Sequence, residues 1–133
     1  MANAIYPKAK ESLLAGDLDL ADDTIKVVLV DTGTYTYSTA HDFYNDLSGV
    51  LGSGVALSSK TIALGVFDAA DVTFTTPTSG TSIEALVIYK DTGNVATSNL
   101  IAYIDTGTGL PFTTNGADID IVWDSGSNKI FAI

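Results

Sequence analysis

The stretch Thr24-Ile-Lys-Val-Val-Leu-Val-Asp31 decides the fold class. It is rich in β-branched and apolar residues, it is too short for a buried helix, and polar residues bound it at both ends, which is typical of a strand. Two similar stretches follow, Ser82-Ile-Glu-Ala-Leu-Val-Ile-Tyr-Lys90 and Asn99-Leu-Ile-Ala-Tyr-Ile-Asp105. The three stretches predict strands of a mostly β protein.

Further strands are predicted on both sides of these three. The segments concerned are 55–63, 65–68, 71–76, 117–123 and 128–133. Gly, Asn, Asp and Pro separate them, and no helical crossovers connect them, so we expect antiparallel pairing in about eight strands. The predicted fold is a single-domain antiparallel β-sandwich or barrel, jelly-roll-like. Asp124-Ser-Gly-Ser-Asn128 predicts a tight hairpin turn between the last two strands.

Two short segments have helical spacing instead. Residues 6–15 place apolar groups about four apart, with Pro7 suited to a first turn and Gly16 to a stop. Residues 39–47 have a similar pattern, with Ser38 or Thr39 available as N-cap. We therefore divide the chain into an N-terminal arm or short helix, 1–16, and a single β domain, 17–133.

Composition excludes several function classes. The 133 residues carry 16 acidic and 6 basic side chains, so the formal charge is -10, and 46% apolar residues are enough for one core. All six basic residues are scattered lysines, which disfavours nucleic-acid and anionic-membrane binding. Cysteine is absent and His41 is the single histidine, so we expect no disulfides, no thiolate or histidine metal site and no cofactor. No leader peptide or membrane span is predicted.

The sequence Asp-Thr-Gly occurs at Asp31, Asp91 and Asp105, and Asp-Ser-Gly at Asp124. Aspartic proteases use this tripeptide to bring two carboxylates together, so a retropepsin-like enzyme using Asp31 is a remote alternative. Four copies in one short chain, none followed by the rest of the protease pattern, fit β-turns better, because Asp caps such turns and Gly accepts positive φ. We predict turns and no catalytic residues.

Two other groups of polar residues could each form a functional site or have an ordinary structural role. Asp17, Asp19, Asp22 and Asp23 could offer oxygens to a calcium ion, but the EF-hand pattern is missing, so a solvated acidic turn is favoured and no metal site is predicted. His41 stands beside Asp42, without any motif that identifies a nucleophile, and ordinary hydrogen bonding is the favoured interpretation.

Six dispersed aromatic residues could bind a carbohydrate or a protein, although packing is the commoner use of such residues. They are Tyr35, Tyr37, Tyr44, Tyr89, Tyr103 and Trp123.

Several segments together resemble a group of small virion proteins of tailed bacteriophages. They are residues 4–16, 25–37, 40–44, 83–93, 100–105 and 121–131, which cover nearly the whole chain. The resemblance implies a non-enzymatic virion structural protein, and within that group we expect a capsid decoration, or cement, protein. A tail or fibre-associated structural module, with tyrosines facing a host glycan, is the alternative.

The resemblance also implies partners and a location. A cement protein binds the major capsid protein at capsomer junctions, commonly as a homo-oligomer such as a trimer, in a virion assembled in the host cytoplasm. Backbone pairing and apolar contacts would use the N-terminal arm and the apolar C-terminal strand. The predicted partner contacts are Ile5, Tyr6, Leu13, Leu14, Ile130, Phe131 and Ile133.

Overall fold

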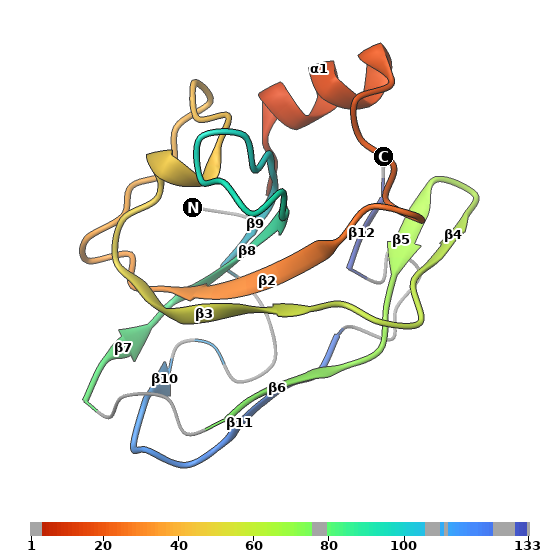
Figure 1. The fold of residues 1–133 in the computed structure, drawn as a ribbon. Coiled ribbons are helices and arrows are strands. Elements are labelled where there is room, and N and C mark those ends of the chain that lie inside the picture. The colour runs from red at the N-terminus through yellow and green to blue at the C-terminus, as the bar shows by residue number, and fades with distance from the viewer. Residues whose placement is uncertain (1–3, 76–79, 106–109, 111, 124–129, 133) are drawn as a thin grey trace.

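A five-stranded antiparallel sheet forms the centre of the computed structural model, which describes residues 4–75, 80–105, 110, 112–123 and 130–132 (Figure 1). The strand order is β1-β9-β8-β2-β3. The bounds are β1 (Ala4–Ile5), β9 (Leu100–Ile104), β8 (Ala85–Lys90), β2 (Ile25–Val30) and β3 (Val50–Ala56). The three apolar stretches that predicted strands are therefore neighbours in one sheet.

The inner strands β2, β8 and β9 are buried along almost their whole length. Val28 and Leu29 point to opposite faces of the sheet, and both are fully buried. Both faces must therefore be covered, which explains why these strands are continuously apolar and do not alternate with polar residues. In the view of Figure 1, α1 lies above this sheet and β6 and β11 lie below it.

The N-terminal segment is part of the domain. Tyr6 is completely buried, and its amide donates a hydrogen bond to the carbonyl of Ile101 on β9. The helix α1 (Pro7–Ala15) starts at the predicted proline and ends at Gly16, which takes a φ of 81° and closes the helix with left-handed geometry. The predicted helix over residues 6–15 is confirmed.

Three small antiparallel sheets complete the described part of the chain. One has the order β12-β5-β4, and the other two are the pairs β11-β6 and β10-β7. Their strands are β4 (Thr61–Ala63), β5 (Val66–Asp68), β6 (Val72–Phe74), β7 (Ser82–Ile83), β10 (Phe112–Thr113), β11 (Ile119–Ile121) and β12 (Phe131–Ala132). The protein is mostly β, with one α-helix and several antiparallel sheets, as expected for a β-sandwich or barrel-like single domain.

Some details of the predicted strands were wrong. Twelve strands are found in the described residues in place of about eight, because the segments 55–63 and 82–90 are each interrupted and because β1 and β10 were not predicted. The last two strands do not pair with each other: β11 pairs with β6 and β12 with β5. The predicted turn between them, Asp124–Asn128, lies outside the described residues. Long-range ladders thus replace the expected local hairpin.

The short helix predicted near residues 39–47, of one or two turns, is one turn in the structure and is of the 3-10 type. This turn is η1 (Tyr44–Asp46), preceded by the extended residue Phe43. Phe43 forms a bridge with Asn99, and the Tyr44 amide bonds to the Ser98 carbonyl. These bonds to the segment before β9 compete with continuous helical bonding, which accounts for the difference.

Candidate functional site

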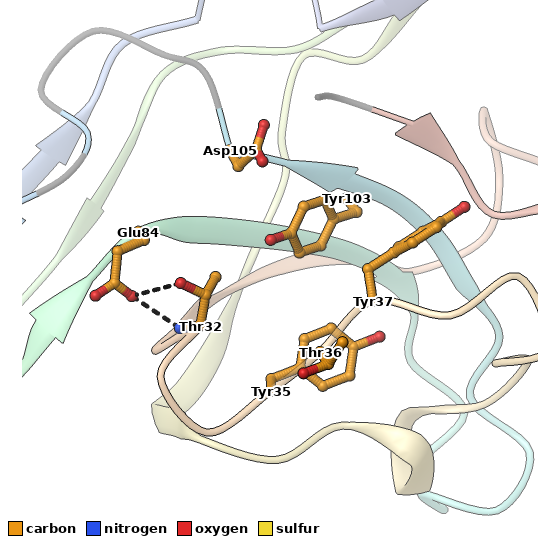
Figure 2. A pocket seen from close by; sticks show the side chains of 7 residues that line it. All are labelled: Thr32, Tyr35, Thr36, Tyr37, Glu84, Tyr103 and Asp105. Carbon is orange, nitrogen blue, oxygen red and sulfur yellow. Dashed lines mark hydrogen bonds between the residues drawn. The ribbon is translucent and has the colours of Figure 1, made fainter. Parts of the chain in front are cut away.

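A pocket of about 320 Å³ lies beside the ends of the central strands. Figure 2 shows the seven side chains that line it: Thr32, Tyr35, Thr36, Tyr37, Glu84, Tyr103 and Asp105. Three are tyrosines, two are carboxylic acids and two are threonines, and none is basic. The pocket therefore combines aromatic rings with negative charge.

The sheet register explains why these residues meet. Val30 at the end of β2 pairs with Ala85 at the start of β8, and Leu86 pairs with Ile104 at the end of β9. In antiparallel neighbours, the end of one strand lies beside the start of the next. The segment after β2, the residue before β8 and the residue after β9 therefore reach the same edge of the sheet.

Hydrogen bonds fix Glu84 against the segment after β2. Its Oε2 accepts bonds from the backbone amide of Thr32, at 2.8 Å, and from the Thr32 hydroxyl, at 3.0 Å (Figure 2). The same segment turns tightly at Asp31, whose backbone carbonyl accepts a bond from the Tyr35 amide. One wall of the pocket is thus held by both side-chain and backbone bonds.

A chain of hydrogen bonds runs from the tyrosines to the single histidine. The hydroxyls of Tyr6 and Tyr35 lie 2.8 Å apart, and the Tyr35 hydroxyl lies 2.7 Å from Nδ1 of His41. Burial raises the pKa of Tyr35 to about 12, and it raises the pKa of Tyr6 even further. Both phenols therefore stay protonated at neutral pH and hold the loop in place. His41 makes an ordinary hydrogen bond, as expected.

The pocket has a negative electrostatic environment. The pKa of Tyr103 is raised first by burial and then by the charges of Asp105 and Glu84. Lysines elsewhere are engaged with other acids: Lys26 with Asp91 at 2.6 Å, and Lys90 with Asp23 at 3.2 Å. Neither of these lysines lines the pocket.

The Asp-Thr-Gly segments act as turns where they are described. Oδ1 of Asp31 accepts a hydrogen bond from the Gly33 amide at 2.8 Å, and Oδ1 of Asp91 accepts one from the Gly93 amide at 2.9 Å. The repeated bond from the acid to the amide two residues later confirms the turn prediction at both sites. Most of the third copy and all of the copy at Asp124 lie outside the described residues.

The acidic segment 17–23 is also a turn held by its own bonds. Oδ1 of Asp19 accepts bonds from the amides of Ala21 and Asp22, while Lys90 pairs with Asp23. Within the described ranges, no group of three or more acids or histidines is arranged to hold a metal ion. Among the same residues, no helix is long and apolar enough to cross a membrane.

The seven predicted partner contacts have very different environments. Tyr6, Ile130 and Phe131 are buried in the chain's own core, and the Phe131 ring stacks on Phe67 at 5.3 Å. Ile5 and Leu13 are partly buried against the same core. Leu14 is 90% exposed, and Ile133 lies outside the described residues. Core packing therefore accounts for most of these side chains, and their contact with a partner stays a prediction.

The sequence analysis predicted strands over 55–63 and 65–68 but did not single out the turn between β4 and β5. Ala63 pairs with Val66, so Leu64 and Gly65 form a two-residue turn, with φ angles of 52° and 76°. The side chains of Ile62 and Leu64 are 53% and 103% exposed. Only Gly65 signalled a turn in the sequence, because the apolar residues before it fit a strand equally well.

No protein-family model matches this chain, and no curated protein matches it.

Proposed function

We propose that this chain is a non-enzymatic structural protein of a tailed-bacteriophage virion, of the capsid decoration type. Its partner is the major capsid protein, and the chain acts as a homo-oligomer, in many copies, in a virion assembled in the host cytoplasm. The resemblance that extends over nearly the whole sequence supports this role. One structural observation supports it further, namely the apolar turn at the tip of the β4–β5 hairpin.

Leu64 is unfavourable in the free protein for two independent reasons. Its φ of 52° belongs to the left-handed region, which costs a residue with a Cβ atom about 1 kcal/mol compared with Gly or Asn. Its side chain is also completely exposed to water. A strained, exposed apolar residue suggests a use outside folding, because burial against a partner would contribute about 1.5–3 kcal/mol.

The strand that leads into Leu64 offers a second means of attachment. β4 is an edge strand, and all three of its residues are exposed. Edge strands pair readily with a strand of another chain, and neighbouring apolar side chains then add specificity. A capsid protein could therefore dock on the hairpin by backbone pairing along β4 and apolar contact at Ile62 and Leu64.

The charge distribution is compatible with display in many copies. Fourteen of the sixteen acids are Asp, and those at Asp31 and Asp91 cap turns. A net charge of -10 keeps a surface soluble and opposes unspecific association.

The substitution Leu64→Asn tests this role. Asn accepts the left-handed conformation of the turn but removes the apolar contact. We expect binding to phage heads lacking this protein to weaken by roughly tenfold or more, as the loss of a buried leucine implies. Val95→Asn is the matched control, since Val95 is an exposed apolar residue in a different loop. Equal binding by the wild type and Leu64→Asn would contradict the proposed contact.

A tail or fibre-associated binding module is the second candidate, and the tyrosines gathered at the pocket favour it. Copy number separates the two roles. A cement protein is expected in hundreds of copies per virion, whereas a tail module is expected in a handful, and quantitative mass spectrometry of purified virions measures the difference.

A further inference from the structure

We propose that the pocket at the ends of β2, β8 and β9 binds an alkylammonium group, presented by a lysine side chain or by a small free amine. This inference does not depend on the virion role. Three features of the pocket carry it: two carboxylates, the partly exposed ring of Tyr37 packed on Tyr103, and the lack of any basic residue among the seven that line it (Figure 2).

The aromatic wall suits a cation. The Tyr103 ring lies 5.3 Å from the Tyr37 ring and 6.3 Å from the Tyr35 ring, and both pairs are tilted rather than stacked. In the view of Figure 2, Tyr103 lies between Tyr37 on one side and Thr32 and Glu84 on the other. Tyr35 and Tyr103 are only 2% and 3% exposed, so Tyr37, which is partly exposed, is the ring that can offer its face to the ligand. Tyrosine faces attract ammonium groups through their negative quadrupole.

The acidic wall supplies charge of the matching sign. Glu84 is held in place through its bonds to Thr32, and Asp105 lies directly after β9. The charges of both acids raise the pKa of the Tyr103 phenol, in addition to the effect of burial, so their fields overlap at the aromatic wall. A positive ligand gains from this field, whereas a neutral sugar does not.

The size of the pocket limits the ligand. A volume of about 320 Å³ is at the lower end of the range of ligand pockets, which run from roughly 300 to 1,000 Å³. One alkylammonium chain or one small quaternary amine therefore fits better than an oligosaccharide. The sheet register fixes Glu84 and Asp105, and hydrogen bonds at Thr32 and Tyr35 hold the segment after β2 against them, so the pocket is preformed.

The test is a titration of the full chain followed by amide chemical shifts in nuclear magnetic resonance. The probes are n-butylammonium, tetramethylammonium and a short peptide with one lysine, and n-butanol and glucose are the neutral comparisons. We expect saturable shifts at Thr32, Glu84 and Asp105 with the ammonium probes alone. Tighter binding of the peptide would indicate a partner's lysine as the source, and tighter binding of the free amines a small molecule.

Two variants distinguish binding at the pocket from general attraction of cations to an acidic protein. Glu84→Gln keeps an oxygen for the bonds to Thr32 but removes the charge, and it should weaken ammonium binding roughly threefold to fivefold. Asp22→Asn removes one exposed acid that does not line the pocket and should leave binding unchanged. Equal weakening by both variants would overturn the proposal. Unsaturable shifts, equal binding of n-butanol, or binding of glucose in place of the amines would also overturn it.

Discussion

The central sheet and the β4–β5 hairpin differ in how deeply their side chains are buried. In β2, β8 and β9 nearly every side chain is buried, whereas β4 exposes all three of its residues and leads into a strained turn. The buried sheet therefore contributes strongly to the stability of the domain. Within the hairpin, Phe67 on β5 belongs to the core, whereas β4 and its turn contribute little to stability. This separation lets β4 and its turn change in sequence for contact with a partner without unfolding the protein.

The largest expected effect lies in the sheet. Leu29→Ala removes a fully buried side chain from β2 and should lower the free energy of unfolding by about 2–5 kcal/mol. Ile62→Ala on β4 should change it by less than about 0.5 kcal/mol, because that side chain is already half exposed. Urea unfolding of both variants measures the contrast. Similar losses in the two variants would show that β4 shares in the stability.

A smaller effect is expected where the N-terminal segment joins the sheet. Tyr6→Phe keeps the buried ring but removes its hydrogen bond with the Tyr35 hydroxyl, which retains its bond with His41. The expected loss is about 0.5–1.5 kcal/mol in the free energy of unfolding. Thermal unfolding of this variant beside wild type measures the loss. An unchanged midpoint would mean that residue 6 contributes through its ring alone.

A substitution in the turn of the hairpin should raise the free energy of unfolding, whereas those above lower it or leave it unchanged. Leu64→Asn is expected to raise the free energy of unfolding by up to about 1 kcal/mol, since Asn-Gly is a favoured pair for a two-residue turn of this geometry. Urea unfolding measures the gain, with Val95→Asn as the neutral control. A loss of stability would show that the Leu64 side chain packs on its own domain, and it would remove the argument for an external contact.

The smallest expected effect is an acid dependence at the end of β8. The hydrogen bond from Lys26 holds the pKa of Asp91 below its usual value of 3.8, and the Gly93 amide adds to this effect. A lowered pKa stabilises the folded state above pH 3.8, and that contribution is lost as the pH falls through the lower folded value. Asp91→Asn should therefore flatten the stability curve below about pH 4. Unfolding midpoints measured from pH 2 to 6 compare the variant with the wild type, and an unchanged curve would contradict the role of the Lys26 bond.

The sequence predicted best the features that depend on local composition. The β-branched runs of β2, β8 and β9 identified the central strands, Pro7 and Gly16 set the bounds of α1, and Asp31 and Asp91 were recognised as turns. Each of these features is set by a few neighbouring residues, so a single sequence is sufficient to find them.

Features that depend on distant partners were missed. The pocket forms where residue 32 follows β2, residue 84 precedes β8 and residue 105 follows β9. No local sequence pattern reveals the register that brings these strand ends together. Phe131 was interpreted as a partner contact because it is apolar and near a terminus, and no local pattern predicted that its ring stacks on Phe67 in β5. Leu64 was overlooked because an apolar residue before glycine also fits a strand.

Amide hydrogen exchange of the full chain, free and bound to phage heads, tests the separation of sheet and hairpin most directly. The central strands should be protected in both states, because they are buried in the free protein. The amides of β4 and its turn, residues 61–65, should exchange quickly in the free chain and become protected on the head. Protection that appears elsewhere on binding, with unchanged exchange in residues 61–65, would contradict the assignment of the hairpin as the contact.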